Sequence, residues 1–178
     1  MTKRPLRTKN KMTDETQSQP EQKQTAKPTE ATKAVPSSGK IAVVLVRGLV
    51  GLTQPVKDTL RMLRLTRKNQ CVVVADNPVM VGMIRKVKDF VTWGSVTDAT
   101  FTELVAKRGR EFLGRTQDSK GKYSYKTLDV NGKKYIPTFN LNPPRKGFGR
   151  KGIKLSFTVS GALGNRGDKI NDLLMRML

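Results

Sequence analysis

The sequence contains no histidine and a single cysteine, Cys71. Without an imidazole, the chain cannot use histidine as a general acid or base near neutral pH, or as a metal ligand. A lone cysteine excludes an internal disulfide framework and suits a reducing cytoplasm. No paired carboxylates and no nucleophile–base arrangement stand out, so the sequence indicates no metal site, no cofactor and no enzyme.

Acidic residues and long apolar runs are also scarce. Among the 178 residues, 35 are Lys or Arg and only 14 are Asp or Glu, which gives a formal net charge of +21. No apolar run approaches the roughly 18 residues that span a bilayer. We find no signal peptide, lipidation site or long basic amphipathic helix. A surface this cationic favours a polyanion over a membrane or a small-molecule substrate, so we predict a nucleic-acid partner.

Residues 1–39 contain no Phe, Trp, Tyr or Ile and are rich in Thr, Gln, Lys, Pro and Glu. Such a composition cannot bury enough apolar surface to offset chain entropy, so we predict an N-terminal tail that is disordered in the free protein. The tail carries eight basic and four acidic residues, which leaves +17 on residues 40–178. Two roles for the tail stay open: it threads along nucleic acid, or it is a neutral spacer.

The stretch 40–109 alternates apolar runs with helical patterns. Runs rich in β-branched residues predict strands at 41–46, 71–75 and 90–93, the last ended by Gly94. Apolar residues at helical spacing follow the N-cap candidates Thr53 and Asn77, and a third helix starts at Thr97 or Asp98. This order predicts an α+β fold with a ferredoxin-like β-α-β-α-β core, in which helices connect parallel strands and lie on one face of the sheet.

Residues 110–178 form a C-terminal extension of that core. Up to residue 139 the extension is polar and irregular, except that Asn131-Gly132 predicts the turn of a hairpin between 128–130 and 133–136.

Two apolar patterns follow further along the extension. An alternation predicts an extended segment that is buried on one face, at Ile153, Leu155, Phe157 and Val159. A last helix begins near Gly167, and its apolar stripe is Ile170, Leu173, Leu174 and Met177.

We call residues 142–154 the basic loop. It contains five cations, three glycines, two prolines and no acidic residue. Pro and Gly break helices, and unpaired cations are costly to bury, so the loop is predicted to be extended and exposed. Its glycines let backbone N–H groups approach a ligand, and phosphate suits such a loop; a solvated loop without a partner is the alternative. The cations are Arg145, Lys146, Arg150, Lys151 and Lys154.

Other candidates lie in and near this loop. Phe148 stacks on an RNA base or anchors the loop to the core, and the sequence does not decide between the two. Asn165 and Arg166 occupy a glycine-rich turn before the last helix, where free N–H groups and positive potential favour phosphate. Asp168 is the alternative partner for those donors.

Near the start of the core, Arg47 follows the first strand and could reach a phosphate. The neighbouring Gly48-x-x-Gly51 lacks the residues of a nucleotide-binding loop, and a tight turn explains it better. Cys71 and Trp93 lie in predicted strands, where core packing is the expected role.

Several short motifs, none specific alone, occur here in a specific order. They are Val46-Arg47-Gly48, GMIRKV at 82–87, FVTWG at 90–94, Pro143-Pro144-Arg145 and GALGNRG at 161–167. In this order they resemble the ribosomal protein L-thirty family of the large subunit, in its longer archaeal form, whose eukaryotic counterpart is protein L-seven. The resemblance covers residues 40–109 and 139–178, and it implies a ferredoxin-like core that binds large-subunit rRNA without a catalytic role.

Three positions depart from the pattern of that family. Val81 stands where a basic residue is frequent, Asn142 where His is frequent, and Lys146 where Gly is frequent. The predicted tail also matches neither the short bacterial start nor the long basic eukaryotic helix.

The resemblance implies a structural, rRNA-binding constituent of the large ribosomal subunit, in the cytoplasm. The implied partners are large-subunit rRNA, 5S rRNA as a further candidate, and neighbouring ribosomal proteins. The alternatives are a free RNA chaperone or other RNP protein, and a nucleotide-dependent enzyme that uses the Gly48–Gly51 turn. We expect RNA contacts at Arg47, Arg85, Arg145, Lys146, Phe148, Arg150, Lys151, Lys154, Asn165 and Arg166.

Overall fold

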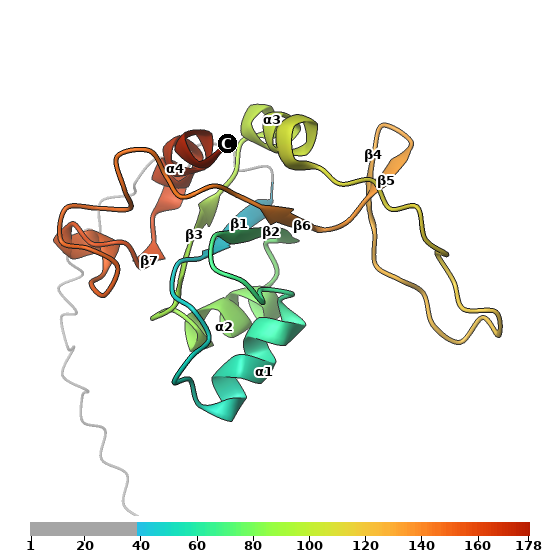
Figure 1. The fold of residues 1–178 in the computed structure, drawn as a ribbon, viewed down its shortest axis with the longest axis horizontal. Helices are drawn as coiled ribbons and strands as arrows, with labels where there is room; N and C mark the ends of the chain where they lie inside the picture. The colour runs from blue at the N-terminus through green and yellow to red at the C-terminus, as the bar shows by residue number, and fades with distance from the viewer. Residues whose placement is uncertain (1–38) are drawn as a thin grey trace, which may run out of the picture. The chain divides into compact units, whose positions relative to one another are not determined.

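The computed structural model describes residues 39–178, so the tail predicted over residues 1–39 lies outside the described residues except for its last one. The elements are arranged as Figure 1 shows. In chain order they are β1 (Lys40–Leu45), α1 (Gln54–Met62), β2 (Gln70–Ala75), α2 (Pro78–Lys86), β3 (Val91–Ser95), α3 (Asp98–Arg108), β4 (Leu128–Val130), β5 (Lys133–Tyr135), β6 (Thr138–Asn140), the 3-10 helix η1 (Phe157–Val159), β7 (Gly164–Asn165), the 3-10 helix η2 (Gly167–Lys169) and α4 (Ile170–Met177).

Five strands form one sheet in the order β6-β2-β1-β3-β7. The prediction that helices connect parallel neighbours is wrong for the first three strands, because β1 pairs antiparallel with both β2 and β3. Lys40 lies opposite Ala75 and Val44 opposite Cys71, so the chain leaves β1 and enters β2 at the same end of the sheet. β2 and β3 therefore run parallel with β1 between them, and α2 joins them. Apolar runs predict that strands exist, but they do not encode the end at which each strand enters the sheet.

Helices cover both faces of this sheet: α1 and α2 lie on one face, and α3 and α4 on the other (Figure 1). Along β1, Val43 and Leu45 belong to the apolar cluster that includes α1 and α2, whereas Ala42 and Val44 belong to the cluster that includes α3 and α4. The prediction of a first strand buried on both faces is confirmed, as is a shared face for the first two helices.

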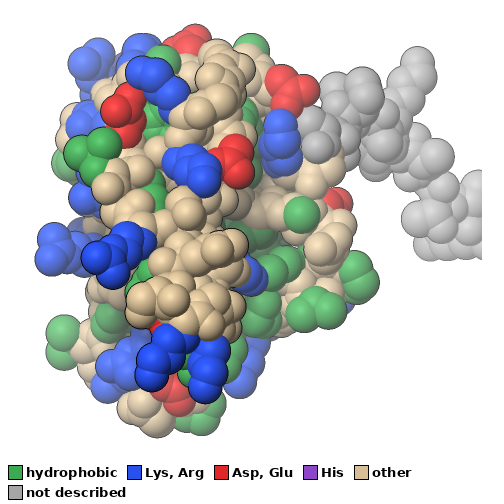
Figure 2. Space-filling model, turned by 90° about the vertical axis from the view of Figure 1, so that its right-hand side faces the viewer, with side chains coloured by type: hydrophobic (Ala, Val, Ile, Leu, Met, Phe, Trp, Pro, Cys, Tyr) green, Lys and Arg blue, Asp and Glu red, His purple; other side chains and the backbone are tan. Residues whose placement is uncertain are grey.

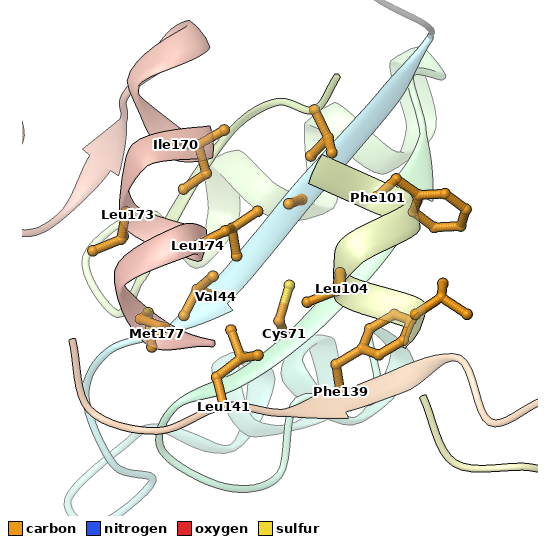
Figure 3. Packing of buried hydrophobic residues seen from close by; sticks show 13 residues of the cluster. Val44, Cys71, Phe101, Leu104, Phe139, Leu141, Ile170, Leu173, Leu174 and Met177 are labelled. Carbon is orange, nitrogen blue, oxygen red and sulfur yellow. The ribbon is translucent and has the colours of Figure 1, made fainter. Parts of the chain in front are cut away.

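The cluster between the sheet, α3 and α4 depends on α4. Its predicted stripe is confirmed, since all four members are fully buried. In Figure 3 Leu174 points from α4 toward Val44 on the sheet, whereas the Leu173 side chain is turned away from Val44, Cys71 and Leu104. The four members are Ile170, Leu173, Leu174 and Met177. The last helix is therefore part of the core and not an appendage.

The C-terminal extension also supplies both edges of the sheet. β6 pairs antiparallel with β2, and β7 pairs parallel with β3. Neither strand was predicted, because segments of two and three residues are too short to show an alternation. Thr138 and Phe139, which the sequence assigned to an irregular segment, are buried in β6.

The predicted hairpin is confirmed as β4 and β5, with Leu128 opposite Tyr135 and Val130 opposite Lys133. Asn131 and Gly132 both have positive φ angles, 51° and 75°. A tight turn that matches the twist of two antiparallel strands needs this backbone conformation, and Asn-Gly adopts it readily.

Gly94 does not end the third strand, contrary to the prediction; it lies inside β3, which continues to Ser95. A Cβ atom at this position would collide with the backbone carbonyl of Gly167 and with the Ile170 side chain. The missing side chain therefore lets the start of the last helical segment lie directly on the strand.

The alternation from 153 to 159 does not form an extended segment, so that prediction is wrong. Ile153, Leu155 and Val159 are exposed, and η1 occupies the end of the stretch. The chain turns back on itself here, since the Gly161 N–H donates to the Ser156 carbonyl and the Phe157 N–H to the Leu163 carbonyl. Four alternating positions are too few to predict a strand when glycines flank them.

We expect Leu173→Ala to lower the free energy of unfolding by roughly 2–5 kcal/mol, because it opens a cavity at a fully buried position. The matched control is Met175→Ala on the same helix, where the side chain is 44% exposed and we expect a change of at most about 1 kcal/mol. Urea unfolding of both variants measures the difference. Equal effects would contradict the assignment of the buried face.

Cys71 is buried as predicted, and burial raises the pKa of its thiol from 9.0 to about 12, although a backbone hydrogen bond at Val43 lowers it. A disulfide reagent at mildly alkaline pH should therefore label the native protein at least about 100-fold more slowly than the urea-unfolded protein. The unfolded thiol ionises from pH 9.0 whereas the folded one stays neutral to about pH 12. The contribution of the neutral Cys71 thiol to the free energy of unfolding is therefore fully present below pH 9.0. It is lost as the pH rises from 9.0 through about 12. Fast labelling of native protein would show that the strand is accessible.

Candidate nucleic-acid interface

The basic loop is exposed but fixed at both ends. At its start the Asn142 N–H donates to the Met177 carbonyl, and the Arg145 N–H donates to the Arg176 carbonyl. Near its end the Lys151 N–H donates to the Ser160 carbonyl. Its side chains are exposed as predicted, except for the buried Pro144 and a half-buried Phe148. The loop is therefore held in place by α4 and by the turn that precedes β7.

The five cations of the loop are exposed to solvent. None of them forms an ion pair within residues 39–178. Lys146 and Gly147 both have positive φ, 66° and 75°, and form a tight turn closed by a hydrogen bond from the Gly147 N–H to the Pro144 carbonyl. Nothing inside the described part of the chain neutralises this charge, so it is available to an anionic partner.

Phe148 is the apolar anchor of the loop. Its half-buried ring packs against two apolar clusters, that of α3 and α4 and a smaller one formed by Val46, Ala162 and Leu163. Of the two roles that the sequence left open, the structure favours the anchor.

Contrary to the expectation from the sequence, Arg166 does not face solvent; its exposed fraction is 6%. Nε donates to Thr92 Oγ1 at 2.9 Å, and one terminal nitrogen donates to the carbonyls of Phe148 and Ala162 at 2.8 and 3.1 Å. The guanidinium also lies over the Phe157 ring, 4.5 Å from its centre. Arg166 therefore links the sheet, the basic loop and the turn before β7.

Positive charge exceeds negative charge around Arg166. Burial lowers the pKa of its guanidinium, and the nearby positive charge of Arg176 lowers it further, whereas Asp172 acts in the opposite direction. Asp172 forms an ion pair of 3.2 Å with Arg176 Nε, but its side chain is largely exposed. One exposed carboxylate thus faces two arginines, which leaves a local excess of positive charge.

Asn165 is exposed at the turn before η2, and its Oδ1 accepts a hydrogen bond from the Gly167 N–H at 2.9 Å. The carboxylate of Asp168 accepts a hydrogen bond from Ser95 Oγ at 2.5 Å and does not cap the helical segment. The alternative in which Asp168 occupies the donors at this helix start is thus not observed.

Side chains from four segments meet around one hollow of about 760 Å³. Among the described residues no acidic side chain lines it, whereas five cationic residues do: Lys146, Arg150, Arg166, Lys169 and Arg176. The sequence did not single out Lys169 and Arg176, because a basic residue in a terminal helix has no local feature that marks it. Phe148 and Asn165 line the same hollow, so five of the ten expected residues lie together.

The other expected residues lie outside this hollow. Lys154 lines a neighbouring one together with Asn165, and Arg145 and Lys151 are exposed on the loop itself. Arg47 lines a small hollow with Ile153, donates to the Asp89 carbonyl at 3.2 Å and lies over the Phe90 ring. Arg85 is exposed on α2, which covers the other face of the sheet from α4.

Cations are also spread over the face drawn in Figure 2, where Lys and Arg side chains clearly predominate over Asp and Glu. Within residues 39–178, no group of His, Cys, Asp and Glu is placed to hold a metal ion, and no helix is long and apolar enough to cross a bilayer. The chemistry this surface offers is attraction and hydrogen bonding to anions.

We expect Arg166→Gln to lower the free energy of unfolding by about 2–4 kcal/mol, since it removes charged hydrogen bonds and leaves buried carbonyls without a donor. Lys154→Gln is the matched control, because this side chain is exposed and forms no hydrogen bond or ion pair within the described residues; a change of at most about 0.5 kcal/mol is expected. Thermal unfolding compares the two. If both variants are equally stable, Arg166 does not hold the loop.

Comparison with known protein sequences shows the family to which the chain belongs. Residues 41–91 match the family described as "Ribosomal protein L30p/L7e". Proteins named "Large ribosomal subunit protein uL30" are similar over most of the chain. The one from Methanococcus maripaludis is 42% identical over 77% of this chain and 98% of its own length. Those from Methanopyrus kandleri and Nanoarchaeum equitans are 41% and 40% identical over 75% and 77% of this chain, and over 100% and 97% of their own lengths. The chain belongs to the ribosomal protein L30p/L7e family, in its archaeal form.

Proposed function

We propose that this protein is a structural constituent of the large ribosomal subunit that binds rRNA through phosphate contacts. The observation that carries the proposal is the surface made by the basic loop and the hollow beside it, where cations gather without a lining carboxylate. The archaeal relatives are named as large-subunit proteins and match nearly their full length, which supports a place in the ribosome with rRNA and ribosomal proteins as partners. Like its family, the protein is not an enzyme.

The proposed mechanism is electrostatic. Lys and Arg side chains that approach RNA phosphates release condensed counterions, and this release drives binding. Because the loop is hydrogen-bonded to α4, its cations are presented at fixed positions and can hold RNA segments in a fixed arrangement. The proposed contacts are Arg145, Lys146, Arg150, Lys151, Lys154 and Asn165, with Arg47 and Arg85 as outlying contacts, and with Phe148 and Arg166 as the residues that position the loop.

Two finer statements belong to this proposal. We propose 5S rRNA as an additional RNA partner, because a surface that binds through phosphate contacts can accept a second RNA that lies beside it. We also propose a cytoplasmic location, as expected for a ribosomal constituent. Binding titrations with large-subunit rRNA and with 5S rRNA at one salt concentration test the first statement; absence of 5S rRNA binding where large-subunit rRNA binds would contradict it.

The test of the basic loop replaces Arg145, Lys146, Arg150 and Lys151 together with Glu. Four attractions to phosphate become four repulsions, so affinity for large-subunit rRNA should fall by at least about 100-fold. The salt dependence of the remaining binding should be shallower, by about 0.7 in the slope of log K against log salt for each single-strand phosphate that the variant no longer neutralises. The free energy of unfolding should change by at most about 0.5 kcal/mol per position, because these side chains are exposed.

A matched control makes the same change of charge in the layer of α1 and α2 and the turn after α1. The replaced residues are Lys57, Arg61, Arg67 and Lys86. This variant should retain clearly more affinity than the loop variant, although its net charge is identical. If both variants lose the same affinity, binding depends on net charge alone and the loop is not the site.

A further inference from the structure

The hollow beside the basic loop has three features that together select a ligand, and the inference from them rests on the proposed function. The first feature is charge. Lys146, Arg150 and Lys169 line the hollow, are exposed and form no ion pair within the described residues. Arg166 and Arg176 line it as well, and Arg176 forms an ion pair with the exposed carboxylate of Asp172. The hollow therefore attracts an anion more strongly than a flat cationic surface does.

The second feature is a run of backbone donors. Within residues 39–178, the N–H groups of Phe148, Gly149 and Arg150 have no hydrogen-bond partner, and these three residues line the hollow. Arg166 and Arg176 donate instead to the carbonyls on this loop, at Phe148 and at Gly147. Successive N–H groups with no partner in a glycine turn form a concave site for phosphate oxygens.

The third feature is an aromatic wall. Phe157 lines the hollow and is half-buried, with the Arg166 guanidinium over its ring and the Lys169 ammonium 5.9 Å from its centre. Unpaired RNA bases stack on aromatic rings. Arg166 is buried and covers part of the Phe157 ring, so the exposed part of this ring is the surface that the hollow offers to a base. Inorganic phosphate would use the cations but not this wall.

The volume of the hollow limits the ligand further. About 760 Å³ falls within the range of sites that hold small organic ligands, roughly 300–1,000 Å³. A nucleotide that is unpaired can be splayed out into such a hollow, whereas a duplex keeps its bases stacked inside and offers only its outer backbone. We propose that the hollow binds one or two unpaired nucleotides of RNA, with a phosphodiester at Lys146, Arg150 and Lys169 and the nucleoside against Phe157.

The test narrows the hollow without changing its charge. Thr158 lines it and is exposed, so Thr158→Leu adds bulk without an aromatic ring and leaves every cation in place. Thr102→Leu, at an exposed position on α3, is the matched control. With the full chain, Thr158→Leu should weaken binding of a short single-stranded oligouridylate by about fivefold and change binding of an RNA duplex of equal length by at most about twofold. The Thr102→Leu control should change neither affinity by more than about twofold.

A second variant keeps the proposal testable if the leucine disturbs folding. Lys169→Gln removes one cation from the hollow, and Arg61→Gln removes one from α1 on the other face of the sheet. Only the first should weaken oligouridylate binding several-fold and reduce the salt slope by about 0.7. Thermal unfolding of each variant shows whether it is folded.

The outcomes separate this proposal from the proposed function. If the wild-type chain does not bind large-subunit rRNA, both fail. If it binds rRNA but Thr158→Leu and Lys169→Gln bind oligouridylate like their controls, the function stands and the hollow is not the nucleotide site. The proposal is also overturned if both variants weaken duplex binding equally. Equal competition by an oligoglutamate peptide would overturn it in favour of an acidic protein segment.

Discussion

The buried guanidinium of Arg166 connects the fold of this protein to the surface that we assign to RNA. It donates at once to Thr92 on β3, to Phe148 in the basic loop and to Ala162 in the turn before β7. A shorter or neutral side chain cannot reach three acceptors in these directions, because only the planar guanidinium presents several fixed donors. Burying a cation without a carboxylate is costly. The cost is offset only where carbonyls and a hydroxyl receive the donors, so this residue keeps the loop in one position on the sheet.

The last helix is the second connection, and it acts from the other side of the loop. Its buried face contributes Leu173 and Met177 to the core, while Arg176 on the same helix donates to the carbonyls of Arg145 and Gly147. Damage to the core must therefore loosen the binding surface. The reverse does not follow, because the core does not depend on the side chains of the loop cations. The binding surface thus depends on the core, whereas the core does not depend on the loop cations. The charge of the loop can therefore change while the fold persists.

Features with a local physical cause were predictable from the sequence. The stripe of α4 follows from the helical period, the burial of β1 from a continuous apolar run, and the β4–β5 turn from the backbone preference of Asn-Gly. The topology was not predictable, since the end at which β2 enters the sheet depends on packing of the whole chain. Arg166 was misjudged for the same reason: its acceptor Thr92 lies 74 residues away, and no local pattern marks an arginine whose partner is that distant. The exposed cations of the loop were predictable because Pro, Gly and charge each exclude burial.

The position of the cations also links the stability of the fold to the binding of an anionic partner. Lys146, Arg150 and Lys169 gather around one hollow beside two arginines, and mutual repulsion of these charges disfavours the compact state. In the free protein, packing of the two apolar clusters must offset this repulsion. A polyanion that binds only the folded chain removes the repulsion and adds its own binding free energy, so it stabilises the fold by mass action. A core on both faces of the sheet is thus the condition for keeping this cationic surface folded in the free protein. In the function that we propose, RNA is the partner whose binding turns the surface from a destabilising feature into a stabilising one.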